Sequence, residues 1–208
     1  MYPIKTPKIV RWPYPELIWR VNTSIKEVFL TFDDGPIPEV TPWVLETLEK
    51  YNACATFFMV GENVAKHPDV FNQVVSSKNS IGNHTYNHLV GWKTDDGSYV
   101  ENVKQCEELV QTNLFRPPHG RIKKSQIRAL KKQYKLIMWD VLSGDFDTST
   151  DSDTVVKNVL ENVSSGSIIV FHDSIKAWPR LKEALPVILE KLKKEGYSFG
   201  DLAKAISK

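Results

Sequence analysis

Glu27-Val28-Phe29-Leu30-Thr31-Phe32 runs directly into Asp33-Asp34-Gly35-Pro36. The six residues before the two carboxylates are mostly β-branched or aromatic, which predicts a buried strand. The aspartate pair then lies at the carboxyl end of that strand, where α/β folds keep their chemistry. Asp before Gly-Pro is also common in turns, so a solvated turn is the alternative at this point.

Outside this stretch, apolar runs alternate with segments whose apolar residues recur at helical spacing. Strands that alternate with helices predict a parallel sheet, and about seven such units in 208 residues favour a small barrel over an open sheet. We therefore expect a single-domain α/β fold, a (β/α)7-type barrel similar to a TIM barrel. The predicted strands are residues 27–32, 54–60, 80–83, 114–116, 135–141, 167–171 and 197–199.

The predicted helices lie between these strands. Ser98 is expected to cap one of them, and Gly166 is expected to close another that runs through residues 155–159. The remaining predicted helices are residues 41–48, 61–66, 69–77, 124–134 and 179–195.

The composition is that of an ordinary globular domain, with 41% hydrophobic and 25% charged residues. The 27 basic and 25 acidic residues nearly balance, so the charge gives no reason to expect a nucleic-acid partner. Cys54 and Cys106 stand alone in apolar segments, which favours reduced thiols over a disulfide framework. No apolar run is long enough to form a transmembrane segment, and no signal peptide is recognised, so we expect a cytoplasmic protein.

Residues 1–26 precede the first predicted strand and form an expected N-terminal extension to the barrel of residues 27–208. Within it, the segment from Arg11 to Arg20 mixes aromatic side chains with flanking arginines. We expect this segment to pack against the barrel, because Pro13 and Pro15 limit any amphipathic helix to a short piece. The alternative is a peripheral contact with the inner face of the membrane.

Polar residues gather at the carboxyl ends of the predicted strands. In a barrel these ends share one mouth, so the side chains are expected to lie close together. Four of the five histidines belong to this group, and scattered surface histidines would not sort in this way. The group is Asp33, Asp34, His84, His88, Arg116, His119, Asp145 and His172.

His84 and His88 are four residues apart, so one helical turn or a tight loop can aim both at a common point. Two imidazoles and one aspartate leave open positions on a divalent ion, as a hydrolytic metal site requires. Zinc is the default for these ligands, with cobalt, nickel and iron as alternatives. One aspartate of the pair can bind the metal while its neighbour stays free for proton transfer.

Hydrolysis of an amide needs a base for the attacking water and an acid for the departing amine. Asp33 and His172 fit these two positions. The alternative for His172 is a core histidine at the end of an apolar strand.

Four motifs carry a family resemblance: Thr-Phe-Asp-Asp-Gly-Pro at 31–36, His-Thr-Tyr-Asn-His at 84–88, Arg-Pro-Pro-His-Gly at 116–120 and Val-Phe-His-Asp at 170–173. In their identity and order the chain resembles the polysaccharide deacetylases. This family, carbohydrate esterase family four, contains chitin, peptidoglycan and chitooligosaccharide deacetylases. The resemblance implies a distorted (β/α) barrel and a divalent metal ion as cofactor.

The resemblance also implies a role for each motif residue. Asp33 would be the catalytic base, His172 the general acid, and Asp34, His84 and His88 the metal ligands. Arg116 would orient and charge-balance Asp33. Substrate contacts would come from Pro118, His119 and Gly120, with the backbone N–H of His119 holding the oxyanion, and from Val170, which would line the pocket for the acetyl methyl group.

Two departures from the family pattern bear on the substrate. Position 119 is usually aromatic in the family and is His119 here, which either fills the same space or adds a donor or a stray metal ligand. The fourth motif commonly reads Asp-x-x-Asp-Trp, whereas this chain has Leu142-Ser143-Gly144-Asp145-Phe146. Asp145 is the expected tuner of the acidic histidine, with Asp147 as the alternative. The altered loop is expected to reshape a wall of the substrate site.

We therefore predict a metal-dependent N-deacetylase that acts on an N-acetylated poly- or oligosaccharide through a metal-activated water. One alternative keeps the chemistry and changes the substrate to a lipid-linked amino sugar or a non-sugar amide. The others are a metal-free hydrolase with paired carboxylates, such as a glycosidase, and a non-catalytic carbohydrate-binding relative. Residues 27–208 would then be the catalytic domain.

Overall fold

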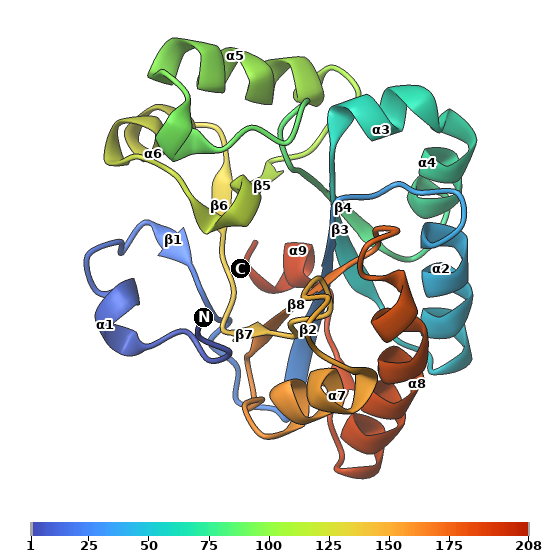
Figure 1. Cartoon of the computed structure of the whole chain (residues 1–208). Helices are drawn as coiled ribbons and strands as arrows, with labels where there is room; N and C mark the ends of the chain where they lie inside the picture. The colour runs from blue at the N-terminus through green and yellow to red at the C-terminus, as the bar shows by residue number, and fades with distance from the viewer. Residues whose placement is uncertain (1, 208) are drawn as a thin grey trace.

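The computed structural model describes residues 2–207 as one curled parallel sheet with most of the helices around its outer side (Figure 1). The strands follow the order β1-β6-β5-β4-β3-β2-β8-β7, and β9 joins β2. This arrangement confirms the expected α/β barrel. The strands are β1 (Leu17–Ile18), β2 (Glu27–Asp33), β3 (Ala55–Met59), β4 (Ser80–Asn83), β5 (Leu114–Phe115), β6 (Lys135–Ile137), β7 (Val141–Leu142), β8 (Ile168–His172) and β9 (Ser198–Phe199).

The central strands β2, β3 and β8 are covered on both faces. All five residues of β3 are buried, as are all residues of β2 after Glu27. Burial on both faces explains why these strands read as continuous apolar runs in the sequence. The helices are α1 (Lys8–Arg11), α2 (Thr41–Lys50), α3 (Gly61–Lys66), α4 (Pro68–Val75), α5 (Asp96–Glu107), α6 (Lys124–Leu130), α7 (Ser152–Leu160), α8 (Trp178–Lys194) and α9 (Leu202–Ala205). In Figure 1, α9 lies within the curl of the sheet.

The predicted strand over residues 135–141 is wrong, because this stretch forms two short strands. The N–H of Met138 donates to the carbonyl of Ile18 beside β1, at 2.7 Å. Two residues later, the N–H of Asp140 donates to the carbonyl of Ile168 in β8, at 3.0 Å. The chain therefore crosses from one edge of the sheet to the other between β6 and β7, and one continuous strand could not pair with both edges.

Two predicted helix ends also differ. Asp95, and not Ser98, caps α5, because the Asp95 carboxylate accepts a hydrogen bond from the Ser98 N–H at 2.9 Å. Gly166 lies beyond the end of α7 and forms the turn before β8. Its N–H donates to the carbonyl of Glu27 at 2.7 Å, and its φ of +83° together with the close carbonyl of Val21 leaves no room for a side chain.

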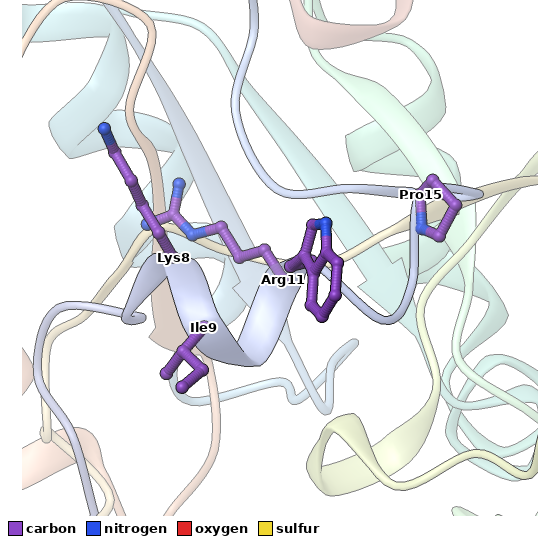
Figure 2. Close-up of a pocket in the computed structure, with 5 residues that line it drawn as sticks. Lys8, Ile9, Arg11 and Pro15 are labelled. Atoms are coloured by element: carbon purple, nitrogen blue, oxygen red, sulfur yellow. The ribbon is translucent and has the colours of Figure 1, made fainter.

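The N-terminal segment adds β1 to the sheet edge beside β6 and carries the short helix α1. In Figure 2, Ile9 leaves α1 on the opposite side from Lys8. Ile9 and Trp12 are 78% and 86% exposed. Within residues 2–207, every helix is too short or too polar to cross a membrane. Cys54 and Cys106 are both free thiols, as expected.

Candidate active site

The predicted site residues converge at one mouth of the barrel. Asp33 and His172 lie opposite each other in the register of β2 and β8. Both line a pocket of about 660 Å³. The predicted residues that line it are Asp33, Asp34, His84, His88, His119, Gly120, Val170 and His172.

Asp33 is held from behind by a buried guanidinium. Arg116 is fully buried, and its Nη1 donates to Asp33 Oδ1 at 2.6 Å and to Thr31 Oγ1 at 2.8 Å. A second arm of the guanidinium donates to the carbonyl of Met138 at 3.1 Å. These hydrogen bonds fix the carboxylate in place and leave its other oxygen, Oδ2, on the side of His84.

Asp34, His84 and His88 form a group that could hold a metal ion. One ligand atom from each residue lies within 4.8 Å of the others. His88 Nε2 lies 3.2 Å from Asp34 Oδ1, and His84 Nε2 lies 3.9 Å from the same oxygen. One carboxylate and two imidazoles suit a divalent transition-metal ion and leave positions open for substrate and water.

The surroundings of His84 fix its tautomer and its charge in the form that can bind a metal ion. Its Nδ1 lies 2.8 Å from the carbonyl oxygen of Arg116, which can only accept a hydrogen bond. Nδ1 therefore carries the proton, and the lone pair of Nε2 is free for a metal. Burial, the largest influence, lowers the pKa of His84 to about 4, so the imidazole is neutral at physiological pH.

His172 is paired with Asp145. Its Nδ1 lies 2.7 Å from Asp145 Oδ1, and its backbone N–H donates to Asp145 Oδ2, also at 2.7 Å. Asp145 is fully buried. Asp147, the alternative partner, instead accepts hydrogen bonds from Tyr2 and Ser149. The geometry therefore places Asp145 behind His172.

The other predicted substrate contacts are His119, Gly120, Val170 and Pro118. The His119 ring packs edge-on against His88, with 4.8 Å between the ring centroids. Within residues 2–207, His119 is outside the cluster of potential ligands. Gly120 and Val170 line the pocket, whereas Pro118 is buried and does not line it.

The backbone is left-handed at several of these positions. The φ angles are 85° at Asp34, 56° at His88 and 57° at His119. Such angles are uncommon outside glycine and cluster at functional sites, where the surrounding structure holds them. The aspartate pair is therefore not an ordinary solvated turn.

Asp173 is a buried residue that the sequence analysis quoted in a motif but gave no role. Its Oδ1 accepts a hydrogen bond from the Gly35 N–H at 3.0 Å, and its Oδ2 accepts one from the Thr41 hydroxyl at 2.6 Å. Asp173 therefore ties the turn after Asp34 to the first residue of α2. The carboxylate fills the space above Gly35, where a Cβ would lie 2.1 Å from it.

Replacement of Asp173 by alanine is expected to destabilise the protein by about 2 kcal/mol, because two buried donors lose their acceptor. Urea unfolding measures the change in the free energy of unfolding. Glu46→Ala, which removes an exposed carboxylate from α2, is the matched control. Equal midpoints for the two variants would contradict this role for Asp173.

Several pocket residues were not predicted. Five come from the N-terminal segment, which sequence reasoning placed on the outside of the barrel. The others follow β5, β6 and β8, and no motif in the sequence marked them. Leu142 and Phe146 belong to the altered loop that was expected to reshape a wall of the site, and both line the pocket. The unpredicted lining residues are Tyr2, Pro3, Thr6, Val10, Trp19, Arg121, Met138, Trp139, Ser174 and Lys176.

Comparison with known proteins agrees with this geometry. The polysaccharide deacetylase family profile matches residues 20–136. A peptidoglycan-N-acetylglucosamine deacetylase of Bacillus cereus is 36% identical over 194 residues, which cover 90% of this chain and 91% of that protein. A chitooligosaccharide deacetylase of Azorhizobium caulinodans is 30% identical over 162 residues, which cover 74% of this chain and 77% of that protein.

A solved structure is also similar over almost the whole chain. The Bc1960 peptidoglycan N-acetylglucosamine deacetylase, in complex with 4-naphthalen-1-yl-N-oxidanyl-benzamide, superposes with a TM-score of 0.89 at 31% identity. The match covers 96% of both chains. These similarities confirm the resemblance that the four motifs predicted, and the chain belongs to the polysaccharide deacetylase family.

Proposed function

We propose that this protein is a metal-dependent N-deacetylase that releases acetate from N-acetylated amino sugars in an oligo- or polysaccharide. One observation carries the proposal: a fixed carboxylate, a fixed imidazole and a three-residue metal-binding group face the same pocket. The relatives named as peptidoglycan and chitooligosaccharide deacetylases support the substrate class.

Asp34, His84 and His88 would hold the metal ion, and zinc is the ion we propose from the donor set. When bound there, the ion supplies Lewis acidity beside the acetyl carbonyl. Asp33 accepts the proton of the attacking water, because its carboxylate is held by Arg116 with one oxygen left free. The backbone N–H of His119 stabilises the developing oxyanion, and Val170 contacts the acetyl methyl group.

His172, which also lines the pocket, donates a proton to the departing amine. Burial favours the neutral ring, but the charge and hydrogen bond of Asp145 outweigh burial and raise the pKa of His172 to about 9. The imidazole is then protonated before the reaction, as a general acid must be.

Replacement of Asp145 by asparagine is expected to shift the alkaline limb of kcat/KM to lower pH. The loss of the negative charge lowers the pKa of His172, so the acid is lost sooner as the pH rises. The pH profile of acetate release measures this shift. Asp147→Asn is the control, since Asp147 does not contact His172, and an unshifted limb in Asp145→Asn would refute the pairing.

Mass spectrometry of candidate substrates tests the function itself. Each acetyl group removed lowers the mass by about 42 Da. The screen compares N-acetylchitooligosaccharides, peptidoglycan fragments, lipid-linked amino sugars and sugar-free N-acetyl amides. We expect acetate release from the first two, which is lost with a chelator and restored by zinc. Release that persists without metal would contradict the proposal, and release from the last two alone would change the substrate class.

A further inference from the structure

Residues 2–10, here called the strap, run along the gap between β6 and β7. Lys5 and Val141 form an antiparallel bridge, and the Leu142 N–H donates to the carbonyl of Ile4 at 2.9 Å. The Thr6 N–H donates to the carbonyl of Asp140, also at 2.9 Å. Figure 1 shows the described start of the chain beside β7. The strap therefore covers the crossing between the two sheet edges.

A buried ion cluster holds the strap in this position. Asp140 is fully buried and pairs with Lys5 of the strap at 2.8 Å. Arg11, next to the strap, and Arg20 pair with the same carboxylate. Arg11 also donates to the carbonyl of Thr6. Because a buried carboxylate is costly without its partners, the cluster fixes the strap against the barrel.

The strap places a phenol ring at the wall of the catalytic pocket. The Tyr2 ring packs against Phe146, with 5.1 Å between the centroids. Its hydroxyl donates to Asp147 at 2.9 Å, and burial together with Asp147 raises the pKa of Tyr2 to about 12, so the donor stays protonated. Phe146 in turn packs edge-on against His172, with 5.0 Å between centroids. The phenol ring is thus one aromatic contact away from the residue that faces the departing amine.

The altered fourth motif makes room for this ring. Gly144 has a φ of +81°, and a Cβ there would lie 3.0 Å from the Tyr2 hydroxyl oxygen. The loop that departs from the family pattern is therefore the loop against which Tyr2 packs. Both features reshape the same wall of the site.

The wall has the chemistry of a sugar-binding surface. Its strap residues Tyr2, Pro3 and Val10 line the pocket together with Trp19 and Phe146. A cavity of about 660 Å³ is far larger than an acetyl group requires, so most of it is space for the rest of the substrate. The C–H bonds of a pyranose ring pack on the electron-rich face of an aromatic ring.

We propose that the strap is a substrate-binding element, in which the Tyr2 ring contacts the pyranose ring that carries the scissile acetamide. This inference rests on the proposed function, because it takes an N-acetylated amino sugar as the ligand. It makes Tyr2 and the loop of residues 142–146 a specificity-determining surface.

Equilibrium binding tests the strap separately from catalysis. Triacetylchitotriose is titrated calorimetrically into the full chain in a metal-free Asp33→Asn background, in which turnover is minimal. Tyr2→Ala is expected to raise Kd about tenfold, and Tyr2→Phe, which keeps the ring, is expected to recover most of this loss. Trp12→Ala is the matched control, because Trp12 is 86% exposed on the same segment and lies outside the pocket lining.

Three results would overturn the inference. They are an unchanged Kd in Tyr2→Ala, an equal loss in Trp12→Ala, and no detectable binding of the trisaccharide by the parent chain. If instead the proposed function is wrong, the unmodified protein will release no acetate from N-acetylated sugars. Acetate release by the unmodified protein is therefore measured in parallel, with triacetylchitotriose and with a sugar-free N-acetyl anilide as substrates.

Discussion

Replacement of Asp33 by asparagine is expected to lower kcat for acetate release by about 10³-fold while metal binding is retained. Asparagine has nearly the shape of aspartate, and its carbonyl oxygen can still accept the hydrogen bond from Arg116. What is lost is the group that accepts a proton from the attacking water. The metal-binding group keeps all three of its residues, because Asp34, His84 and His88 are unchanged.

Steady-state kinetics and the metal content of the purified variant together check this prediction. Asp147→Asn is a suitable control, since it removes another carboxylate near the pocket that contacts neither Arg116 nor the metal-binding group. A rate within tenfold of the unmodified protein would show that another group takes the proton. Loss of metal in Asp33→Asn would show that Asp33 acts as a ligand instead.

The choice of asparagine matters because Arg116 is fully buried. Its guanidinium also packs over the Phe58 ring, 4.1 Å from the centroid, in an apolar setting. Removal of one partner from a buried ion pair costs about 3–5 kcal/mol, since the other charge stays behind without compensation. An apolar residue at position 33 would therefore lower the stability of the protein as well as its activity. Asparagine limits the loss of stability, because its side-chain oxygen still accepts the hydrogen bond from Arg116.

The sequence predicts the central barrel well because its strands are buried on both faces. A strand such as β3 leaves a run of apolar residues that local reasoning can find. The residues directly after such runs are then placed at one mouth by the topology of a parallel barrel. Asp33, Asp34, His84, His88 and His172 meet there for that reason.

The crossing between β6 and β7 could not be predicted in the same way. Residues 135–141 are apolar enough to read as one strand, and only pairing with Ile18 and Ile168 breaks them in two. The strap depends on ion pairs between Asp140 and cations more than 100 residues away in the chain. The residues around Asp140 in the sequence do not indicate that its carboxylate is buried or which basic side chains pair with it.

Which aspartate contacts His172 also became clear only from the three-dimensional structure. Asp145 and Asp147 are two residues apart, and both were candidates for the partner of His172. In the structure they diverge, with Asp145 turned inward to His172 and Asp147 turned to Tyr2. The family resemblance favoured Asp145, which is the residue that contacts His172. Nothing in the motifs indicated the contact between Asp147 and Tyr2.

Replacement of His84 by alanine is expected to weaken zinc binding by more than about 100-fold and to abolish acetate release at limiting zinc. His84 is buried, neutral and oriented by the carbonyl of Arg116, so its Nε2 is positioned before any metal arrives. His88 is 31% exposed and has more freedom, so His88→Ala is expected to lose less affinity. Chelator competition followed by metal analysis measures both variants.

His119→Ala separates metal binding from general damage to the pocket. Its imidazole packs on His88 but lies outside the ligand group within the described residues, so the variant should keep zinc. If His119→Ala lost zinc as completely as His84→Ala, the histidine would be a ligand and not a space-filling replacement for an aromatic ring. If His84→Ala kept both zinc and activity, the metal site would have to lie elsewhere. The expected order of affinity loss is His84 above His88 above His119. It follows from the burial and fixed orientation of His84, the partial exposure of His88 and the position of His119 outside the ligand group.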